Sequence, residues 1–153
     1  MSVRSKGREI ALQILYQFDL FEKHEVDEAL KSYIAGFEEE DKPLRKSSIS
    51  FARERINLVL SHKDEIDRVI NQHATHWKLG RMASIDRNIL RLGVSELCFC
   101  PDVPPKVAIN EALELAKRYG SDESSPFVNG ILDGIYKKRV KGQKGGDAGR
   151  SDD

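Results

Sequence analysis

The stretch Val103–Tyr136, VPPKVAINEALELAKRYGSDESSPFVNGILDGIY, decides the fold, because it contains two well-delimited helices joined by a short polar turn. Pro104 and Pro105 precede the first helix and Gly120 follows it. Pro126 lies in the first turn of the second helix. Proline at the start and glycine at the end is the arrangement that helix ends favour. Both helices carry an apolar stripe, so we expect both to pack against other helices.

Five further segments carry apolar residues with the period of an amphipathic helix, and no stretch alternates as a β-strand does. We therefore expect an all-α protein of about seven helices in two small packed bundles, formed by helices one to three and four to seven. Residues 1–139 are predicted to form a single helical domain, and residues 140–153 a disordered tail of Gly, Lys and Asp. The five segments are Lys6–Phe21, Asp27–Phe37, Ser47–Ser61, Asp64 into the stretch HATHWKLGRM, and Ile85–Phe99, with Asp27, Asp64 and Ser84 as predicted N-caps.

The composition is typical of a chain with a modest core: of 153 residues, 39 % are apolar and 33 % are charged. No apolar run approaches the roughly 20 residues that a membrane span needs, and no signal peptide follows the charged start. We expect a cytoplasmic protein. Basic and acidic residues balance at 25 each, whereas a general nucleic-acid binder is expected to be basic. Any site for a polyanion must therefore be local.

The sequence contains no pattern that favours a catalytic site or a metal site. The sequence contains no Walker loop and no signature of a Ser-His-Asp triad. One alternative is a metal site in which His73 and His76 meet Cys98 and Cys100, but this spacing matches no standard zinc motif. The two cysteines are too close for an ordinary disulfide framework, and we expect reduced thiols. The sequence thus predicts a protein that is not an enzyme and needs neither metal nor cofactor.

Arg4, Lys6 and Arg8 form a cluster at the start of the first helix, which we call the basic segment. Positive charge there opposes the helix dipole, so helix stability does not explain it. Basic side chains neutralise phosphates and release counterions, which gives affinity for RNA without sequence choice. The turn Ser121–Ser125 offers further donors, because the backbone N–H groups at a helix start bind anions. The basic segment and this turn are therefore candidate RNA contacts.

Two aromatic residues, Tyr16 and Phe127, lie beside polar turns. Sequence-specific RNA recognition stacks unpaired bases on such rings. Both positions also fit apolar faces of their helices, so a place in the core is the alternative for each. If the fold brings Phe127 and its turn beside Tyr16 and the basic segment, these scattered pieces form a single RNA site.

Three blocks carry a resemblance that covers nearly the whole chain up to Tyr136: GREIALQILYQFDL near the start, IDRNILRLGVSEL in the fifth predicted helix, and VPPKVAINEALELAKRYG followed by FVNGILDGI. On these blocks the chain resembles the NusB family of bacterial transcription antitermination factors. The resemblance implies an all-helical protein that binds boxA, a short single-stranded element in nascent ribosomal RNA leader transcripts. It also implies NusE, a small-subunit ribosomal protein, as the partner in RNA binding, and NusA, NusG and RNA polymerase in a larger complex.

The resemblance assigns roles to particular residues. RNA contacts are expected from the basic segment, Tyr16 and Phe127, with Glu123 and Ser124 in the turn. Asp86 and Arg87, at the start of the fifth helix, are expected to face NusE. Asp86 also falls within the apolar arc of its helix, which favours burial instead. Some relatives form homodimers, and the sequence leaves the oligomeric state open.

The chain departs from the family pattern in its basic segment, because Ser5 and Gly7 interrupt an arm that is often denser in arginine. Weaker phosphate contact is the expected consequence, and a contribution from the basic residues 137–144 is open. Two other hypotheses stand beside RNA binding. One is a helical scaffold that acts only through protein partners. The other is a stand-alone relative of the N-terminal domain of ribosomal RNA cytosine methyltransferases. Catalysis would require an α/β cofactor domain after the seventh helix, where we expect a tail instead.

Overall fold

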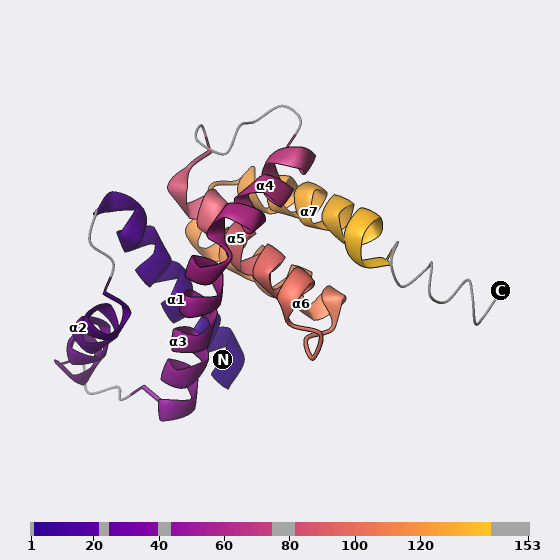
Figure 1. Cartoon of the computed structure of the whole chain (residues 1–153). Coiled ribbons are helices and arrows are strands. Elements are labelled where there is room, and N and C mark those ends of the chain that lie inside the picture. The colour runs from indigo at the N-terminus through magenta and orange to yellow at the C-terminus, as the bar shows by residue number, and fades with distance from the viewer. Residues whose placement is uncertain (1, 22–24, 40–43, 75–81, 142–153) are drawn as a thin grey trace. The chain divides into compact units, whose positions relative to one another are not determined.

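The computed structural model of the chain describes residues 2–21, 25–39, 44–74 and 82–141, and these residues are helical without any strand (Figure 1). The predicted all-α class is thereby confirmed. The seven α-helices of the described part are α1 (Val3–Leu20), α2 (Val26–Glu39), α3 (Lys46–Ser61), α4 (Lys63–His73), α5 (Ser84–Phe99), α6 (Pro105–Tyr119) and α7 (Ser124–Ile135), and α7 continues into a π-helical segment, η2 (Tyr136–Lys141).

The chain divides into two compact units at the α3–α4 junction. Unit 1, residues 1–62, contains α1, α2 and α3. Unit 2, residues 63–153, contains α4 to α7 and η2. Each unit has its own buried apolar residues, because each amphipathic helix covers its apolar stripe with a neighbour from the same unit.

In unit 1, α1 packs along α3, and α2 adds to both. Contact is closest at Gly7 of α1, where a Cβ atom would lie 2.6 Å from Cδ1 of Phe51 and 3.0 Å from the carbonyl oxygen of Ser48. Ser48 also donates a hydrogen bond of 2.9 Å from its Oγ to the carbonyl oxygen of Val3. The first turns of α1 are therefore fixed against α3, which matters because they carry the basic segment.

The structure corrects the predicted helix starts. Helix α1 begins at Val3, not near Lys6, because Ser2 caps it and its side chain accepts a 3.0 Å hydrogen bond from the backbone N–H of Ser5. The predicted caps of three other helices lie one or two positions inside the first turn. Acidic groups are still favourable there, because they face the positive end of the helix dipole. The displaced residues are Asp27 in α2, Asp64 in α4 and Ser84 in α5.

In unit 2, α5 is the central helix, in contact with α4, α6, α7 and η2. Its residues from Asn88 to Leu97 are all buried, polar ones included. Arg91 is only 6 % exposed, and it pairs with Asp67 of α4 through bonds of 2.8 Å from Nε and 3.0 Å from Nη2. Against α7, a Cβ atom at Gly93 would lie 2.8 Å from Cδ1 of Leu132. Helix α5 therefore joins α4 by a buried ion pair and α7 by close packing.

Val140 and Lys141, the first two residues of the predicted tail, belong to η2, and the prediction of a disordered tail stays a prediction. Residues 142–153 lie outside the described residues, as do residues 40–43 and the stretch 75–81, which includes His76. Within the described ranges, no helix combines the length and the apolar character that a membrane crossing requires.

Candidate nucleic-acid interface

The basic segment is part of α1, within its first two turns, and is not an arm that precedes the helix. Arg4 is exposed. Lys6 is half-buried and forms an ion pair of 3.0 Å with Glu9. Arg8 is only 4 % exposed. An ideal helix also turns Lys6 by about 200° from Arg4, whereas Arg4 and Arg8 are one turn apart on one side. Arg4 and Arg8 therefore act together, and Lys6 lies on the opposite side of α1.

Three guanidinium groups surround the aromatic ring of Phe51 on α3. The Cζ atoms of Arg4, Arg8 and Arg55 lie 5.4, 5.1 and 4.3 Å from the ring centroid. These distances are within the range of a cation–π interaction. Arg55 also pairs with Glu54 at 2.9 Å. We call Arg4, Arg8 and Arg55 the arginine cluster.

Sequence reasoning missed Phe51 and Arg55, although both lie in a predicted helix. Their spacing places them one turn apart on the same side of α3. An aromatic residue and an arginine at this spacing are common in helices, however, and the pattern does not say that arginines from a second helix approach the same ring. Only the pairing of α1 with α3 brings the cluster together.

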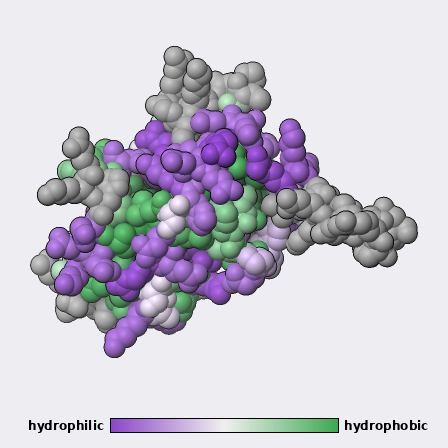
Figure 2. Space-filling view, viewed as in Figure 1, coloured by the Kyte–Doolittle hydropathy of each residue, from purple (hydrophilic) through white to green (hydrophobic). Residues whose placement is uncertain are grey.

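Tyr16 lies in the last turns of α1 and is 37 % exposed. The core alternative for Tyr16 is therefore not what the structure shows. Leu12, one turn earlier, is fully buried, whereas Leu20 and Phe21 are 59 % and 66 % exposed. The end of α1 thus carries exposed apolar and aromatic surface. Figure 2 shows that hydrophobic areas, in green, lie between hydrophilic ones on one face of the protein. An exposed tyrosine ring is a suitable surface for stacking a base.

The turn before α7 places its three candidate residues in different surroundings. Glu123 is exposed at the N-cap position of α7, and Phe127 is half-buried in the first turn. Ser124 is only 2 % exposed. Its Oγ accepts a 2.9 Å hydrogen bond from the backbone N–H of Ser121, and it packs so closely on Gly120 that a side chain there would overlap with it. The Ser124 side chain therefore holds the turn in shape.

Asp86 and Arg87, the predicted partner-binding residues, lie in the first turn of α5 and are both partly buried. One carboxylate oxygen of Asp86, Oδ1, is buried and accepts no hydrogen bond within the described part of the chain. A buried oxygen without a donor is unfavourable. Asp86 therefore lies between the two expectations, neither fully in the core nor fully at the surface.

The described residues contain no group of three or more His, Cys, Asp or Glu side chains that could hold a metal ion. His76, one member of the metal alternative, lies outside the described residues. Cys98 and Cys100, both within the described part of the chain, are not joined by a disulfide; Cys98 is an exposed residue and Cys100 is buried. The ligands considered from the sequence do not assemble in the part that the structure covers.

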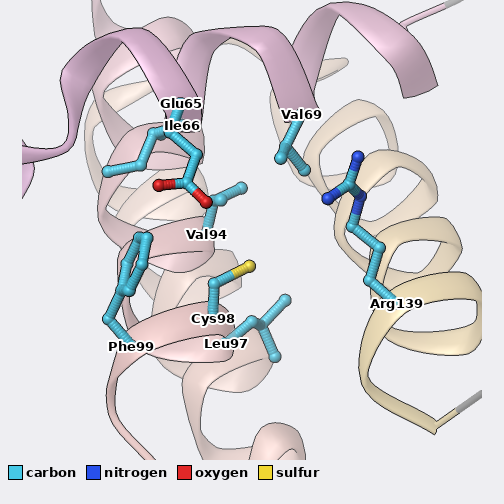
Figure 3. Close-up of a pocket in the computed structure, with 8 residues that line it drawn as sticks. All are labelled: Glu65, Ile66, Val69, Val94, Leu97, Cys98, Phe99 and Arg139. Atoms are coloured by element: carbon cyan, nitrogen blue, oxygen red, sulfur yellow. The ribbon is translucent and has the colours of Figure 1, made fainter. Parts of the chain in front are cut away.

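A pocket of about 210 Å³ opens among α4, α5 and η2. Glu65, Cys98 and Arg139 supply its polar groups, and apolar side chains of α4 and α5 supply the rest of its wall (Figure 3). The sulfur of Cys98 points into the pocket. Burial raises the pKa of this thiol, the nearby Arg139 lowers it, and Glu65 raises it further. A raised pKa disfavours the thiolate, so the pocket does not suit a nucleophilic cysteine.

The candidate RNA residues therefore form two groups. Unit 1 carries the basic segment and Tyr16 on one helix, with Phe51 and Arg55 beside it. Unit 2 carries Glu123, Ser124 and Phe127 at one helix start. The expected adjacency of Tyr16 and Phe127 joins residues of different units, and it stays a prediction.

Comparison with known proteins adds an independent line of evidence. The sequence model of the NusB family matches residues 5–137. The transcription antitermination protein NusB of Myxococcus xanthus is 50 % identical over 135 residues, which are 88 % of this chain and 95 % of the relative. NusB of a Geobacter species is 44 % identical over 138 residues, covering 88 % and 94 % of the two chains.

Solved structures agree with the sequence comparison. NusB of T. maritima superposes with a TM-score of 0.76 at 35 % identity, covering 88 % of this chain and 90 % of that one. A chain from a crystal structure of the antitermination factors NusB and NusE in complex with double-stranded RNA gives 0.77 at 31 % identity, covering 90 % and 98 %. With sequence and fold in agreement over most of its length, this chain belongs to the NusB family.

Proposed function

We propose that this protein is a transcription antitermination factor that binds boxA-type single-stranded RNA in nascent ribosomal RNA leader transcripts together with NusE, and so modifies RNA polymerase. Its curated relatives are transcription antitermination proteins. The observation that carries the proposal is the surface of α1, where an exposed Arg4 and an exposed Tyr16 lie on one helix. Phosphate contact and base stacking are the two interactions that single-stranded RNA binding combines.

Each proposed contact has a distinct role. Arg4 neutralises phosphate, with Arg8 beside it and Lys6 on the other side of the helix. Tyr16 and Phe127 stack unpaired bases. Glu123 accepts hydrogen bonds from base amino groups, since an ionised carboxylate is an acceptor only. Ser124 keeps the turn in the shape that these contacts need, because its Oγ accepts a hydrogen bond from the backbone N–H of Ser121.

We propose that NusE binds at the start of α5. Asp86 has a buried oxygen that accepts no hydrogen bond within the described residues, and a donor from NusE at this point would satisfy it. Arg87 beside it adds a charge that can steer association. The larger assembly would contain NusA, NusG and RNA polymerase, and a homodimer is a further state of the free protein. The role is non-enzymatic, without metal or cofactor, and belongs to the cytoplasm, where bacterial transcription occurs.

A binding titration tests this function. The protein is titrated with a boxA-like RNA and with a scrambled RNA of equal composition, with and without NusE, at two salt concentrations. We expect NusE to increase affinity for the boxA-like RNA alone, and added salt to weaken binding. Equal affinity for the two RNAs in the presence of NusE would contradict the proposal. If the affinity for NusE depends on neither the RNA sequence nor the salt concentration, the helical scaffold is favoured instead.

A further inference from the structure

We infer that Phe51 and Arg55 of α3 are positioning residues for RNA binding, because they hold the exposed Arg4 and the buried Arg8 in a preformed array at the start of α1. The inference rests on the proposed function and deepens it. It assigns a role in RNA binding to a helix to which neither the sequence nor the family resemblance gave one. It also explains why the basic segment is interrupted.

The ring of Phe51 is the centre of this array. It lies against α1 only because residue 7 is glycine, since a Cβ atom there would be 2.6 Å from Cδ1 of the ring. Arg4 and Arg8 flank Gly7 on the same side of α1 and reach the ring from that side, at 5.4 and 5.1 Å. Arg55 reaches it from α3 at 4.3 Å. Gly7 therefore brings the ring and its two arginines together, although it looks like a gap in the basic segment.

The second interruption, Ser5, fixes the start of the helix. Its backbone N–H donates to Oγ of Ser2 at 3.0 Å, and the two hydroxyl groups are 2.8 Å apart. The carbonyl oxygen of Val3 accepts a hydrogen bond from Ser48 of α3. These bonds hold the residues on either side of Arg4 in place. Arg4 is thus carried by a capped and anchored helix.

The arginine cluster concentrates positive charge beside a low-dielectric ring. Like charges repel one another, and the negative face of an aromatic ring offsets part of that repulsion. Arg55 is 2 % exposed and pairs with Glu54, so it is not placed to reach a phosphate itself. Its effect on RNA passes through the ring and through Arg4, which is exposed. A phosphate at Arg4 then binds a cation whose position is already set, and little side-chain freedom is lost on binding.

A double-mutant cycle in the full-length protein tests the inference. Phe51→Leu removes the aromatic ring but keeps an apolar side chain, and Arg55→Met removes the buried guanidinium but keeps its stem. We expect each variant to lower affinity for the boxA-like RNA, with NusE present, by about two- to fivefold, the range of a single cation–π interaction. In an Arg4→Ala background the same changes should have almost no effect on RNA affinity, because the effects of substitutions that act through one group do not add.

Two controls separate positioning from general destabilisation. Phe51→Tyr keeps the ring and should restore wild-type affinity. Val59→Ala makes a cavity on α3 two turns from the ring, at a residue only 1 % exposed, and should lower the melting temperature without changing RNA affinity or its salt dependence. Phe51→Leu, by contrast, should make the slope of log affinity against log salt shallower, by at most about one, the value for complete loss of one phosphate contact.

The outcomes are distinguishable. Loss of affinity from Arg55→Met that persists undiminished in the Arg4→Ala background would overturn the inference, because Arg55 would then act independently of Arg4. Unchanged RNA affinity in folded Phe51→Leu and Arg55→Met would also overturn the inference. The proposed function would still stand in that case if the wild type prefers the boxA-like RNA to the scrambled RNA. If Phe51→Leu does not fold, the affinities of Arg55→Met with and without Arg4→Ala test the inference by themselves. Equal binding of boxA-like and scrambled RNA by the wild type would instead reject the proposed function.

Discussion

Gly93 shows at the residue scale how a single missing Cβ atom allows two helices to pack closely. A Cβ atom at this position of α5 would lie 2.8 Å from Leu132 of α7, which is fully buried. At Gly130 of α7, in contrast, a new Cβ would meet no atom of the described residues within 4 Å. The two glycines therefore differ in what replacement by alanine does, although both are inside helices.

We expect Gly93→Ala to destabilise the protein by about 1–3 kcal/mol, because overpacking forces Leu132 or the helix backbone to move. Gly130→Ala is the matched control. It should be neutral or stabilising by up to about 1 kcal/mol, because alanine favours the helix and meets no neighbour. Urea unfolding followed by circular dichroism measures both. A Gly93→Ala protein as stable as Gly130→Ala would contradict the close packing of α5 and α7.

The environment of Cys98 gives a second prediction at this scale. Burial raises the pKa of its thiol, so the thiol stays protonated to a higher pH than a free cysteine and reacts more slowly at pH 8. Arg139 lowers the pKa and Glu65 raises it. Arg139→Ala should therefore slow alkylation further and Glu65→Gln should accelerate it. The rate is measured with iodoacetamide by mass spectrometry of the peptide that contains Cys98. Faster alkylation of Cys98 in Arg139→Ala, or slower alkylation in Glu65→Gln, would contradict these causes of the pKa shift.

At the scale of elements, the pair formed by Arg91 and Asp67 joins the central helix α5 to α4. The two side chains are 7 % and 19 % exposed, and their closest distance is 2.8 Å. Arg91 also donates to the side chain of Asn88 at 3.2 Å. Two bonds to one carboxylate fix the angle of the guanidinium plane as well as its position. The pair thus sets how α4 lies along α5.

Asp67→Ala should destabilise the protein by about 2 kcal/mol, because it leaves the charge of Arg91 largely buried without its carboxylate partner. The full cost of a buried pair is larger, but the partial exposure of Asp67 reduces it. Asp27→Ala, which removes the exposed partner of Arg53 in unit 1, is the control and should change stability by less than about 1 kcal/mol. Chemical denaturation measures both, and equal effects would contradict a structural role of the Asp67 pair.

At the scale of the whole molecule, the proposed RNA contacts are divided between the two units. Tyr16 belongs to unit 1 and Phe127 to unit 2. Their common role is a proposal, since each is described within its own unit. Mutation can test it directly, because an RNA that contacts both rings loses affinity when either is removed.

We expect Tyr16→Ala and Phe127→Ala each to weaken binding of the boxA-like RNA by about 1–3 kcal/mol, the usual loss for one stacked base. Tyr16→Phe, which keeps the ring, should bind nearly as well as the wild type. Affinity is measured by fluorescence anisotropy with NusE present, and circular dichroism checks that each variant folds. Folded variants with unchanged affinity would remove these two residues from the RNA site.

The sequence by itself determined the helices and the family. Helical periodicity is local, so apolar residues three and four positions apart reveal a helix without knowledge of its neighbours. Proline and glycine mark helix ends for the same reason, and the prolines before α6 are one example. The start of α1 was placed too late because its cap, Ser2, stands before a run of charges that hides the beginning of the pattern.

Only the tertiary structure decided what the polar residues do. Arg8 and Ser124 were predicted as RNA contacts, yet both are almost fully buried. Burial depends on which helix faces which, and that choice joins residues far apart in the chain. Phe51 meets Arg4 and Arg8 across more than forty positions, as the pairing of α1 with α3 requires. Gly7, which the sequence presents as a gap among basic residues, permits that pairing because the absence of its side chain leaves room for the Phe51 ring.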